Sequence, residues 1–288
     1  MTRRSARHTM ALLRLHLACG LGLLTRLPVE RLLPPRYRAS AGRQTPLPWP
    51  LGRSIWCWPL IGGALGTVTG GVLELLRLVH VPPLVAACMA LAAQTLLTGA
   101  LHEDGLADLA DAAGGSTRER RLDIMRDSHL GSFGTIALVL AFGIRAAALA
   151  ALAAHTGWAG VIACAVAGLL SRAGMLVLPA HLPPARTNGL AHALAPLPSA
   201  PLAGALGGTC VLTFGLMTLW EHHGGESGGP HPVTLGLALL PPAAACLGVV
   251  VAAGTARRLL GGYTGDVLGA CVVIVECLVL ATFAALAA

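Results

Sequence analysis

Seven stretches of this sequence are apolar for about twenty residues or more, and their length constrains the fold more than any other feature. A helix of about 20 apolar residues crosses a hydrocarbon core about 30 Å thick. Only 11% of the 288 residues are charged and the mean hydropathy is +0.71, whereas an ordinary soluble domain has about 25% charged residues. The predicted spans are roughly Ile55–Val79, Pro83–Leu101, Ser132–Ala154, Trp158–Ala180, Pro201–Trp220, Thr234–Ala253 and Val267–Ala288.

A further apolar stretch near the start, Ala11 to Leu24, is short for a crossing and contains Arg14. We predict that it forms an interfacial or half-inserted helix. The sequence contains no evident internal repeat and no long polar segment that would form a soluble appendage. The predicted fold class is therefore all-α: a polytopic transmembrane helical bundle of about seven spans, forming a single integral membrane domain over residues 1–288.

The arginines predict how the chain is oriented, because all 20 basic residues are of this type. Arginine occurs before the first predicted span and in 102–131, 181–200 and 254–266, but not in 80–82, 155–157 or 221–233. By the positive-inside rule, the arginine-bearing connections of this multi-pass protein lie in the cytoplasm, at the cell inner membrane. With polar residues gathered there, an enzyme acting on cytosolic solutes is favoured over a transporter, and without a lysine-rich tract no nucleic-acid partner is expected.

The densest polar motif runs from His102 to Asp111, at the end of the second predicted span. On a helix, Asp104, Asp108 and Asp111 fall within an arc of about 60°. Three carboxylates on one face repel each other unless a cation sits among them, and their hard oxygens suit magnesium, calcium or manganese. A solvated acidic helix end is the main alternative. Gly105 would let a substrate approach closely, or would serve helix packing alone.

Acidic and basic side chains alternate in the rest of the same connection, residues 118–132. Such a mixture is typical of sites that hold a nucleotide polyphosphate through arginines and a carboxylate-bound metal. A salt-bridged surface helix explains Arg118, Arg120 and Arg121 equally well. The stronger catalytic or substrate-binding candidates are those nearest the next span: Arg126, Asp127, Ser128 and His129.

A third group of candidates surrounds the start of the last predicted span. Glycines at a loop-to-helix junction can present backbone N–H groups to an anion, and Asp266 could add a metal ligand. A carboxylate inside a span, as at Glu276, is a functional candidate by default, with a structural hydrogen bond as the alternative. Arg145 and Arg172, also within spans, should face the protein interior. The substrate-binding candidates are Gly262, Thr264, Gly265, Arg172 and Glu276.

Taken together, these motifs resemble the cobalamin synthase family, the adenosylcobinamide-GDP ribazoletransferases. The chain contains H-x-D-G-x-x-D-x-x-D from His102, R-D-S-x-x-G from Arg126 and G-x-x-G-D from Gly262, in this order. The resemblance covers nearly the whole chain and extends to Leu24–Val29, Trp58–Gly62 and Ser171–Ala173. It implies a Mg²⁺-dependent phosphotransferase that joins adenosylcobinamide-GDP to α-ribazole or α-ribazole 5′-phosphate. The products would be GMP and adenosylcobalamin or its 5′-phosphate, which completes nucleotide loop assembly in cobalamin biosynthesis.

The resemblance also suggests roles for individual residues. Arg126 would hold a diphosphate oxygen, His102 or His129 would assist the attack of the acceptor, and Arg26 would contribute to substrate binding. Glu103 departs from the family pattern, which has an apolar residue there, and would add charge at the site. The predicted metal ligands are Asp104, Asp108, Asp111 and Asp266.

Two other functions remain open from the sequence. A CDP-alcohol phosphotransferase acting on a lipid acceptor has a similar aspartate triad, but its Ala-Arg pair after the Asp-Gly and its later glycine and aspartates are absent here. A metal-cation transporter is the alternative from a different class. The lipid bilayer is an obligatory partner in each case, and a second copy of the chain or other corrinoid-assembly enzymes are candidate protein partners.

Overall fold

The computed structural model describes residues 3–34, 37, 49–154, 158–187, 189–223 and 238–287. Within these ranges the regular elements are helices, which confirms the all-α prediction. In chain order they are α1 (Arg3–Leu24), α3 (Leu51–Ser54), η1 (Ile55–Cys57), α4 (Trp58–Leu78), α5 (Pro83–Thr98), α6 (Leu101–Ala112), α7 (Arg118–Ile124), α8 (Ser132–Ala154), α9 (Trp158–His181), α10 (Gly189–Leu194), α11 (Ser199–His223), α13 (Leu240–Leu260) and α14 (Gly265–Ala287).

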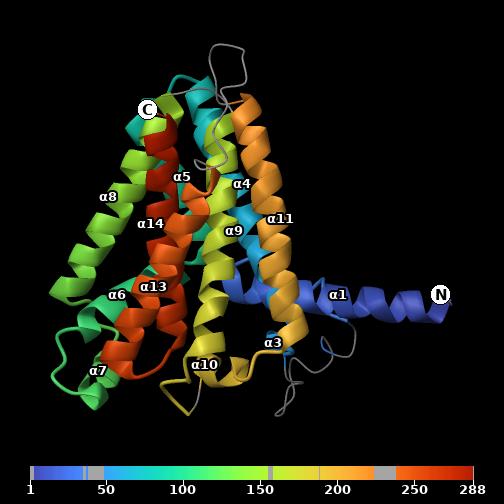
Figure 1. The fold of residues 1–288 in the computed structure, drawn as a ribbon, viewed down its shortest axis with the longest axis vertical. Coiled ribbons are helices and arrows are strands. Elements are labelled where there is room, and N and C mark those ends of the chain that lie inside the picture. The colour runs from blue at the N-terminus through green and yellow to red at the C-terminus, as the bar shows by residue number, and fades with distance from the viewer. Residues whose placement is uncertain are drawn as a thin grey trace.

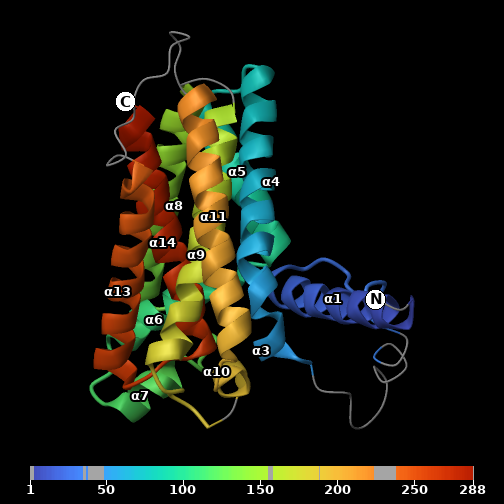
Figure 2. The same cartoon turned by 45° about the vertical axis from the view of Figure 1, so that its right-hand side comes forward.

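The long helices run up and down beside one another in one bundle (Figures 1 and 2). Among the described residues, six helices are long and apolar enough to cross a membrane, or seven if the bent pair α5 and α6 is one span. The prediction of about seven spans is therefore confirmed. The segments α3, α7 and α10 lie at one end of the bundle, and the C-terminus lies at the other. The arginine-bearing connections thus share one end.

The sixth span ends later than the sequence predicted. α13 covers Leu240–Leu260 instead of Thr234–Ala253, and residues 234–237 lie outside the described residues. Arg257 and Arg258 form the last turn of this helix, where the prediction had a loop. Basic side chains are favourable at a helix C-terminus because they face the negative end of the helix dipole. Hydropathy alone ends the span too early for that reason.

The second predicted span is bent. α5 ends at Thr98, and α6 sets off from Leu101 in a direction 91° away. Gly99 and Ala100 make the turn with φ values of +67° and +58°. Such left-handed values are easy for glycine and uncommon for alanine. A continuous helix to Leu101 was therefore wrong, and the aspartates lie on a separate helix.

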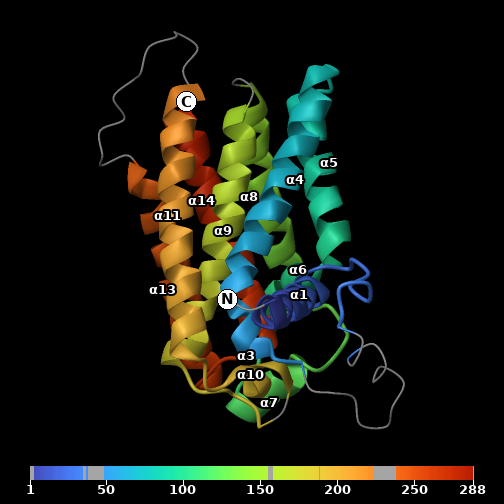
Figure 3. The ribbon, with the colours of Figure 1, turned by 90° about the vertical axis from the view of Figure 1, so that its right-hand side faces the viewer.

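The N-terminal helix α1 lies crosswise to the bundle, beside the lower part of α4 (Figure 3). It is held to the start of that span by side chains: the indole Nε1 of Trp56 donates to Nδ1 of His16 at 3.1 Å. A Cβ on Gly20 would come within 2.6 Å of Ile61, so the helices are in close contact. This orientation agrees with the predicted interfacial helix, although α1 begins earlier, at Arg3.

At the centre of the bundle, α9 packs tightly against α4 along a row of glycines. Gly62, Gly66 and Gly70 follow each other at intervals of four residues and therefore share one face of α4. A Cβ on Gly70 would lie 2.5 Å from the Cα of Val161 in α9. Small residues let two membrane helices approach to backbone contact, which increases van der Waals packing. This contact gives the polar side chains of α9 a fixed place inside the bundle.

Candidate active site

The aspartate helix α6 crosses the first turns of α14 at very short range. A Cβ on Gly105 would come within 2.5 Å of the carbonyl oxygen of Asp266, and one on Gly269 would lie 3.2 Å from the Cα of His102. The structure thus gives Gly105 a packing role. It also brings the carboxylates of two distant motifs to one place. Asp104 is exposed, and Asp108 and Asp266 are half-buried.

The start of α14 is fixed by a loop from another part of the chain. Residues Pro184 and Tyr263 form a short parallel bridge, in which the N–H of Tyr263 donates to Pro183 O at 2.9 Å and that of Ala185 to Tyr263 O at 2.8 Å. Gly262 packs directly against this loop. Thr264 caps the helix: its Oγ1 accepts from the N–H of Val267 at 3.3 Å. Gly262 and Thr264 therefore shape the junction that carries Asp266.

The same loop brings Arg186 to the acidic cluster, the group formed by Asp104, Asp108, Asp111 and Asp266. Its Nη1 lies 3.9 Å from Oδ2 of Asp266, and its Nη2 donates to Leu122 O at 3.1 Å. Asp104, Asp111 and Asp266 all repel the charge of Asp108, and Arg186 offsets them. From the sequence, Arg186 served only as a topology marker. Its solitary position in its connection was a signal, but nothing in the sequence indicated that the loop reaches Asp266.

Asp111 differs from the other aspartates because both of its oxygens already accept hydrogen bonds. Oδ2 accepts from the N–H of Gly131 and Oδ1 from that of Gly134, both at 2.8 Å. These groups belong to the start of α8, where the first N–H groups have no partner within the helix. Asp111 therefore caps α8 and holds the preceding loop, with Arg126 to His129, next to α6.

The donor chemistry of the acidic cluster fits magnesium. In the described part of the chain, no three His, Cys, Asp or Glu side chains stand ready to enclose a metal ion. Mg²⁺ does not need such an enclosure, because it keeps several waters and usually takes one or two carboxylates together with substrate phosphates. Asp104, Asp108 and Asp266 supply those hard oxygens at a face with excess negative charge.

A cavity of about 230 Å³ opens beside the carboxylates of Asp104 and Asp266. Gly265 and His102 also line it, and Nε2 of His102 is buried without a hydrogen-bond partner among the described residues. The rest of the lining is apolar and comes from five helices: Leu23, Leu24, Trp58, Leu101, Met175, Leu268 and Gly269. The acidic cluster thus adjoins a hydrophobic recess.

The loop between α7 and α8 is exposed to solvent from Arg126 to Leu130. Arg126 lies 3.5 Å from Asp123, and Nδ1 of His129 lies 2.5 Å from Oδ1 of Asp127. That hydrogen bond raises the pKa of His129 and lowers the pKa of Asp127. Ser128 is exposed as well. The described structure leaves these four side chains accessible to a solute that approaches α6.

Two arginines of α7 have structural partners. Arg118 donates to the carbonyl oxygens of Leu260 and Ala185 at 2.7 and 2.8 Å, and Arg121 donates to Leu259 O at 3.2 Å. They thereby satisfy carbonyls at the end of α13, which lack partners within the helix. A structural role, the alternative to phosphate binding, therefore accounts for both arginines. Arg120 is exposed.

Comparison with known proteins identifies the family. A model described as cobalamin-5-phosphate synthase matches residues 16–284. The chain belongs to this family. A relative from Rhizobium etli (strain CIAT 652), named adenosylcobinamide-GDP ribazoletransferase, is 39% identical over 94% of this chain and 95% of its own length. Relatives of the same name from Bradyrhizobium diazoefficiens and Sinorhizobium medicae are 40% and 41% identical over 76% and 81% of this chain, and over 78% and 86% of their own lengths. No solved structure matches.

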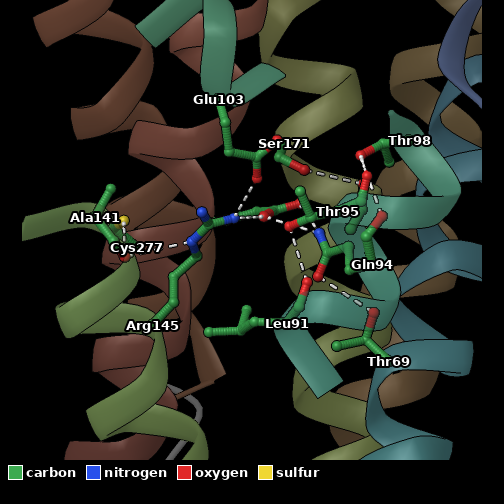
Figure 4. Close-up of polar contacts among 12 residues, drawn as sticks. Thr69, Leu91, Gln94, Thr95, Thr98, Glu103, Ala141, Arg145, Ser171 and Cys277 are labelled. Carbon is green, nitrogen blue, oxygen red and sulfur yellow. Dashed lines mark hydrogen bonds and ion pairs between the residues drawn. The ribbon is translucent and has the colours of Figure 1, made fainter. Parts of the chain in front are cut away.

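Two of the candidates in this cobalamin-5-phosphate synthase family member lie away from the acidic face, in an ion network inside the bundle (Figure 4). Arg172 donates to Glu276, and both Nε2 contacts of Gln94 with the Glu276 carboxylate are 3.1 Å long. Nη1 of Arg145 donates to Glu276 at 3.1 Å and to Glu103 at 3.0 Å. Arg145 and Arg172 are each 1% exposed, which confirms that they face the interior.

This network gives Glu103 a structural role in place of the expected active-site role. We expected its charge at the active site, but its side chain is buried and paired with Arg145. On α6, Glu103 points toward α8 while its neighbour Asp104 lies on the exposed side. The expectation was wrong because residues next to each other on a helix point about 100° apart. Glu103 and Arg145 join α6 to a membrane span.

Arg26 lies close to the bend between α5 and α6. Its N–H donates to Leu97 O at 2.7 Å, and its side chain passes directly over Gly99. A side chain on Gly99 would collide with that guanidinium. Arg26 is exposed. It therefore stands at the end of α1, beside the turn that leads into the aspartate helix.

Proposed function

We propose that this chain is a membrane-embedded adenosylcobinamide-GDP ribazoletransferase. It would join adenosylcobinamide-GDP to α-ribazole or α-ribazole 5′-phosphate, with GMP as the second product. Family membership over residues 16–284 supports the activity. The observation that carries the location of the site is the meeting of α6 and α14, where Asp104, Asp108 and Asp266 share one open face.

The reaction needs a ribose hydroxyl as nucleophile. If α-ribazole 5′-phosphate is the acceptor, the product named for this family still contains the 5-phosphate, so that phosphate is not the attacking group. The hydroxyl oxygen forms a bond to the phosphorus nearest the corrinoid, the bond between the two phosphates breaks, and the hydroxyl proton is released. Positioning of the two substrates and stabilisation of charge on the diphosphate should contribute most of the rate.

We infer that Asp104, Asp108 and Asp266 hold Mg²⁺ together with substrate phosphate oxygens. When bound, the ion would neutralise charge that develops on the leaving GMP. Arg186 lies beside Asp266 and keeps that carboxylate oriented. Asp111 is the fourth predicted ligand. Because it accepts hydrogen bonds from two backbone N–H groups at the start of α8, it would also position the α7–α8 loop.

Arg126 and the histidines would act from the substrate side of this face. Arg126 is exposed and lies five positions before Gly131, whose N–H donates to Asp111, so it can reach a diphosphate bound at α6. Its planar guanidinium suits a phosphate oxygen. His102 is buried beside the cavity, whereas His129 is exposed and paired with Asp127. Only His129 is placed to exchange a proton with solvent.

We further propose that this end of the bundle faces the cytoplasm at the cell inner membrane, following the arginine distribution. Cysteine labelling in a background without the eight native cysteines tests the orientation. A Ser128→Cys variant in membrane vesicles should react with an impermeant thiol reagent only from the cytoplasmic face. Labelling from the opposite face alone would reverse the assignment.

The activity is tested with purified protein in liposomes, supplied with adenosylcobinamide-GDP, α-ribazole and Mg²⁺. Release of GMP together with a corrinoid product of the correct mass supports the proposal. In a parallel assay supplied with a CDP-alcohol and a lipid acceptor, formation of a lipid phosphodiester would support the lipid-synthesis alternative instead. Omission of Mg²⁺ and addition of a chelator should stop GMP release, and a rate unaffected by both would remove the metal from the proposal.

A further inference from the structure

We propose that the cavity beside Asp104 and Asp266 binds the aromatic base of the acceptor nucleoside, and that its lining selects which base is accepted. The inference rests on the proposed function and adds to it the part of the substrate that this recess recognises. The lining combines motif residues, among them His102, Asp104 and Asp266, with Met175 and Leu101, which belong to none of the motifs.

The shape of the cavity suggests which end faces the reacting groups. Its acidic end is open, because Asp104 and Leu101 are exposed, the latter to 44%. Its other end is closed by side chains that are at most 3% exposed and come from α1, α4, α9 and α14: Leu24, Trp58, Met175 and Leu268. A ligand that enters base first would leave its ribose at the carboxylates.

The chemistry of the lining fits an apolar aromatic ring. Trp58 offers only its carbon surface, because its Nε1 already donates to Oγ of Ser54 at 3.2 Å. A cavity of about 150 Å³ accommodates benzene, so one of about 230 Å³ has room for two fused rings. A benzimidazole attached to ribose is such a ring system, with one unsubstituted nitrogen.

We assign to His102 the polar contact that this nitrogen requires, which needs a small turn of its imidazole toward the cavity. Its side chain lines the cavity, is 3% exposed overall, and has an Nε2 without a partner in the described part of the chain. A buried nitrogen of this kind costs free energy unless a ligand or water satisfies it. Guanine, the base on the other substrate, has several donors and acceptors along its edge and would leave most of them unpaired at the apolar end of the cavity. The apolar end therefore suits the acceptor base better than guanine.

A selectivity measurement tests the proposal. The Met175→Ala variant is assayed with two acceptors, the α-ribosides of benzimidazole and of the larger naphthimidazole, and the ratio of their kcat/KM values is compared with that of the wild type. We expect the ratio to move at least about tenfold toward the larger base, since a methylene-sized change in an apolar pocket alters selectivity by about 10–200-fold. Because it is a ratio, it does not depend on how much of the variant is folded.

The matched control is Met217→Ala in α11. Met217 is a methionine of similar burial, 2% against 3% exposed, and does not line the cavity. Its ratio should equal that of the wild type. The KM for adenosylcobinamide-GDP should be unchanged in both variants, because that substrate is assigned to the acidic face outside the recess.

A second variant and a wild-type measurement cover a failure of Met175→Ala to fold. Leu24→Ala enlarges the cavity from α1 and should shift the ratio in the same direction. With the wild type, a carboxylate on the benzimidazole ring should lower kcat/KM at least about tenfold, because a charge is costly in an apolar recess. Unchanged ratios in the variants, or equal use of the charged base, would overturn the inference. If none of the acceptors supported GMP release, the proposed function itself would be overturned.

Discussion

The acidic face of α6 and the ion network inside the bundle both concentrate charge, but they balance it differently. In the network, Arg145 and Arg172 face Glu103 and Glu276, so two positive charges meet two negative ones within the protein. On the acidic face, Asp104, Asp108, Asp111 and Asp266 are offset by Arg186. The charges of the first arrangement balance each other, whereas the second keeps an excess of negative charge that a cation can offset.

This difference separates structural from catalytic charge in a membrane protein. Buried ions in a span are tolerated when they pair with each other, and the network uses them to connect α6, α8, α9 and α14 (Figure 4). Glu103 and Asp104 are adjacent in sequence yet belong to different regions. Substitutions in the two regions should therefore affect different quantities, one the free energy of unfolding and the other the catalytic rate.

The largest expected effect is on catalysis at the acidic face. Asp104→Asn should lower kcat by several powers of ten, because it removes a charged metal ligand from an exposed position, while the thermal midpoint stays within a few degrees of the wild type. Asp266→Ala should behave similarly. Both are measured by GMP release and by thermal unfolding in detergent. The control is Glu119→Gln, which changes an exposed carboxylate on α7 and should retain activity. A near-normal kcat in Asp104→Asn would show that Asp104 is not a metal ligand.

The next effect is on stability, in the network. Glu276→Gln should lower the free energy of unfolding by about 3–5 kcal/mol, the usual result of removing one partner from a buried ion pair. The double variant Arg172→Met, Glu276→Met leaves Arg145 paired with Glu103 and should recover part of the loss. Both are compared by denaturation in the same detergent. A double variant less stable than Glu276→Gln would show that charge balance is not what matters there.

Asp111 combines a predicted metal-ligand role with a structural hydrogen-bonding role, and its substitution should have a smaller effect than the changes above. Asp111→Asn keeps one acceptor for Gly131 and Gly134 and loses the charge. Loss of a good cap costs about 0.5–2 kcal/mol. If Asp111 mainly positions the loop, its variant should show a higher KM for adenosylcobinamide-GDP with an apparent Mg²⁺ affinity near that of the wild type. A weakened Mg²⁺ affinity equal to that of Asp104→Asn would make Asp111 a full ligand.

The smallest effect concerns the exposed pair of Asp127 and His129. Their hydrogen bond raises the pKa of His129 above its usual 6.5, so this contribution is present at low pH and lost as the pH rises through the raised pKa. It lowers the pKa of Asp127 below its usual 3.8, so that contribution is lost as the pH falls. The pair is strongest between about pH 4 and 6.5. NMR titration of His129 should give a lower pKa in Asp127→Asn, and an unchanged pKa would rule out the contact.

Much of the fold could be predicted from the sequence, because crossing a membrane requires long apolar helices. The span Ser132–Ala154 was located to the residue. The bend at Gly99 and Ala100 was not, since hydropathy measures the transfer of a segment and not its direction. The late end of α13 was missed because its arginines look like loop residues to hydropathy.

The sequence by itself determined the class of the protein, the number of spans, the family and the aspartate motif, because each depends on the identity and spacing of nearby residues. Only the tertiary structure decided which residues meet: Asp266 with α6 and with Arg186, Met175 and Trp58 in one cavity, and Glu276 with Arg172 in the interior. These contacts join helices that are far apart along the chain. They depend on backbone packing at positions such as Gly105 and Gly66, where the absence of a side chain lets two helices touch.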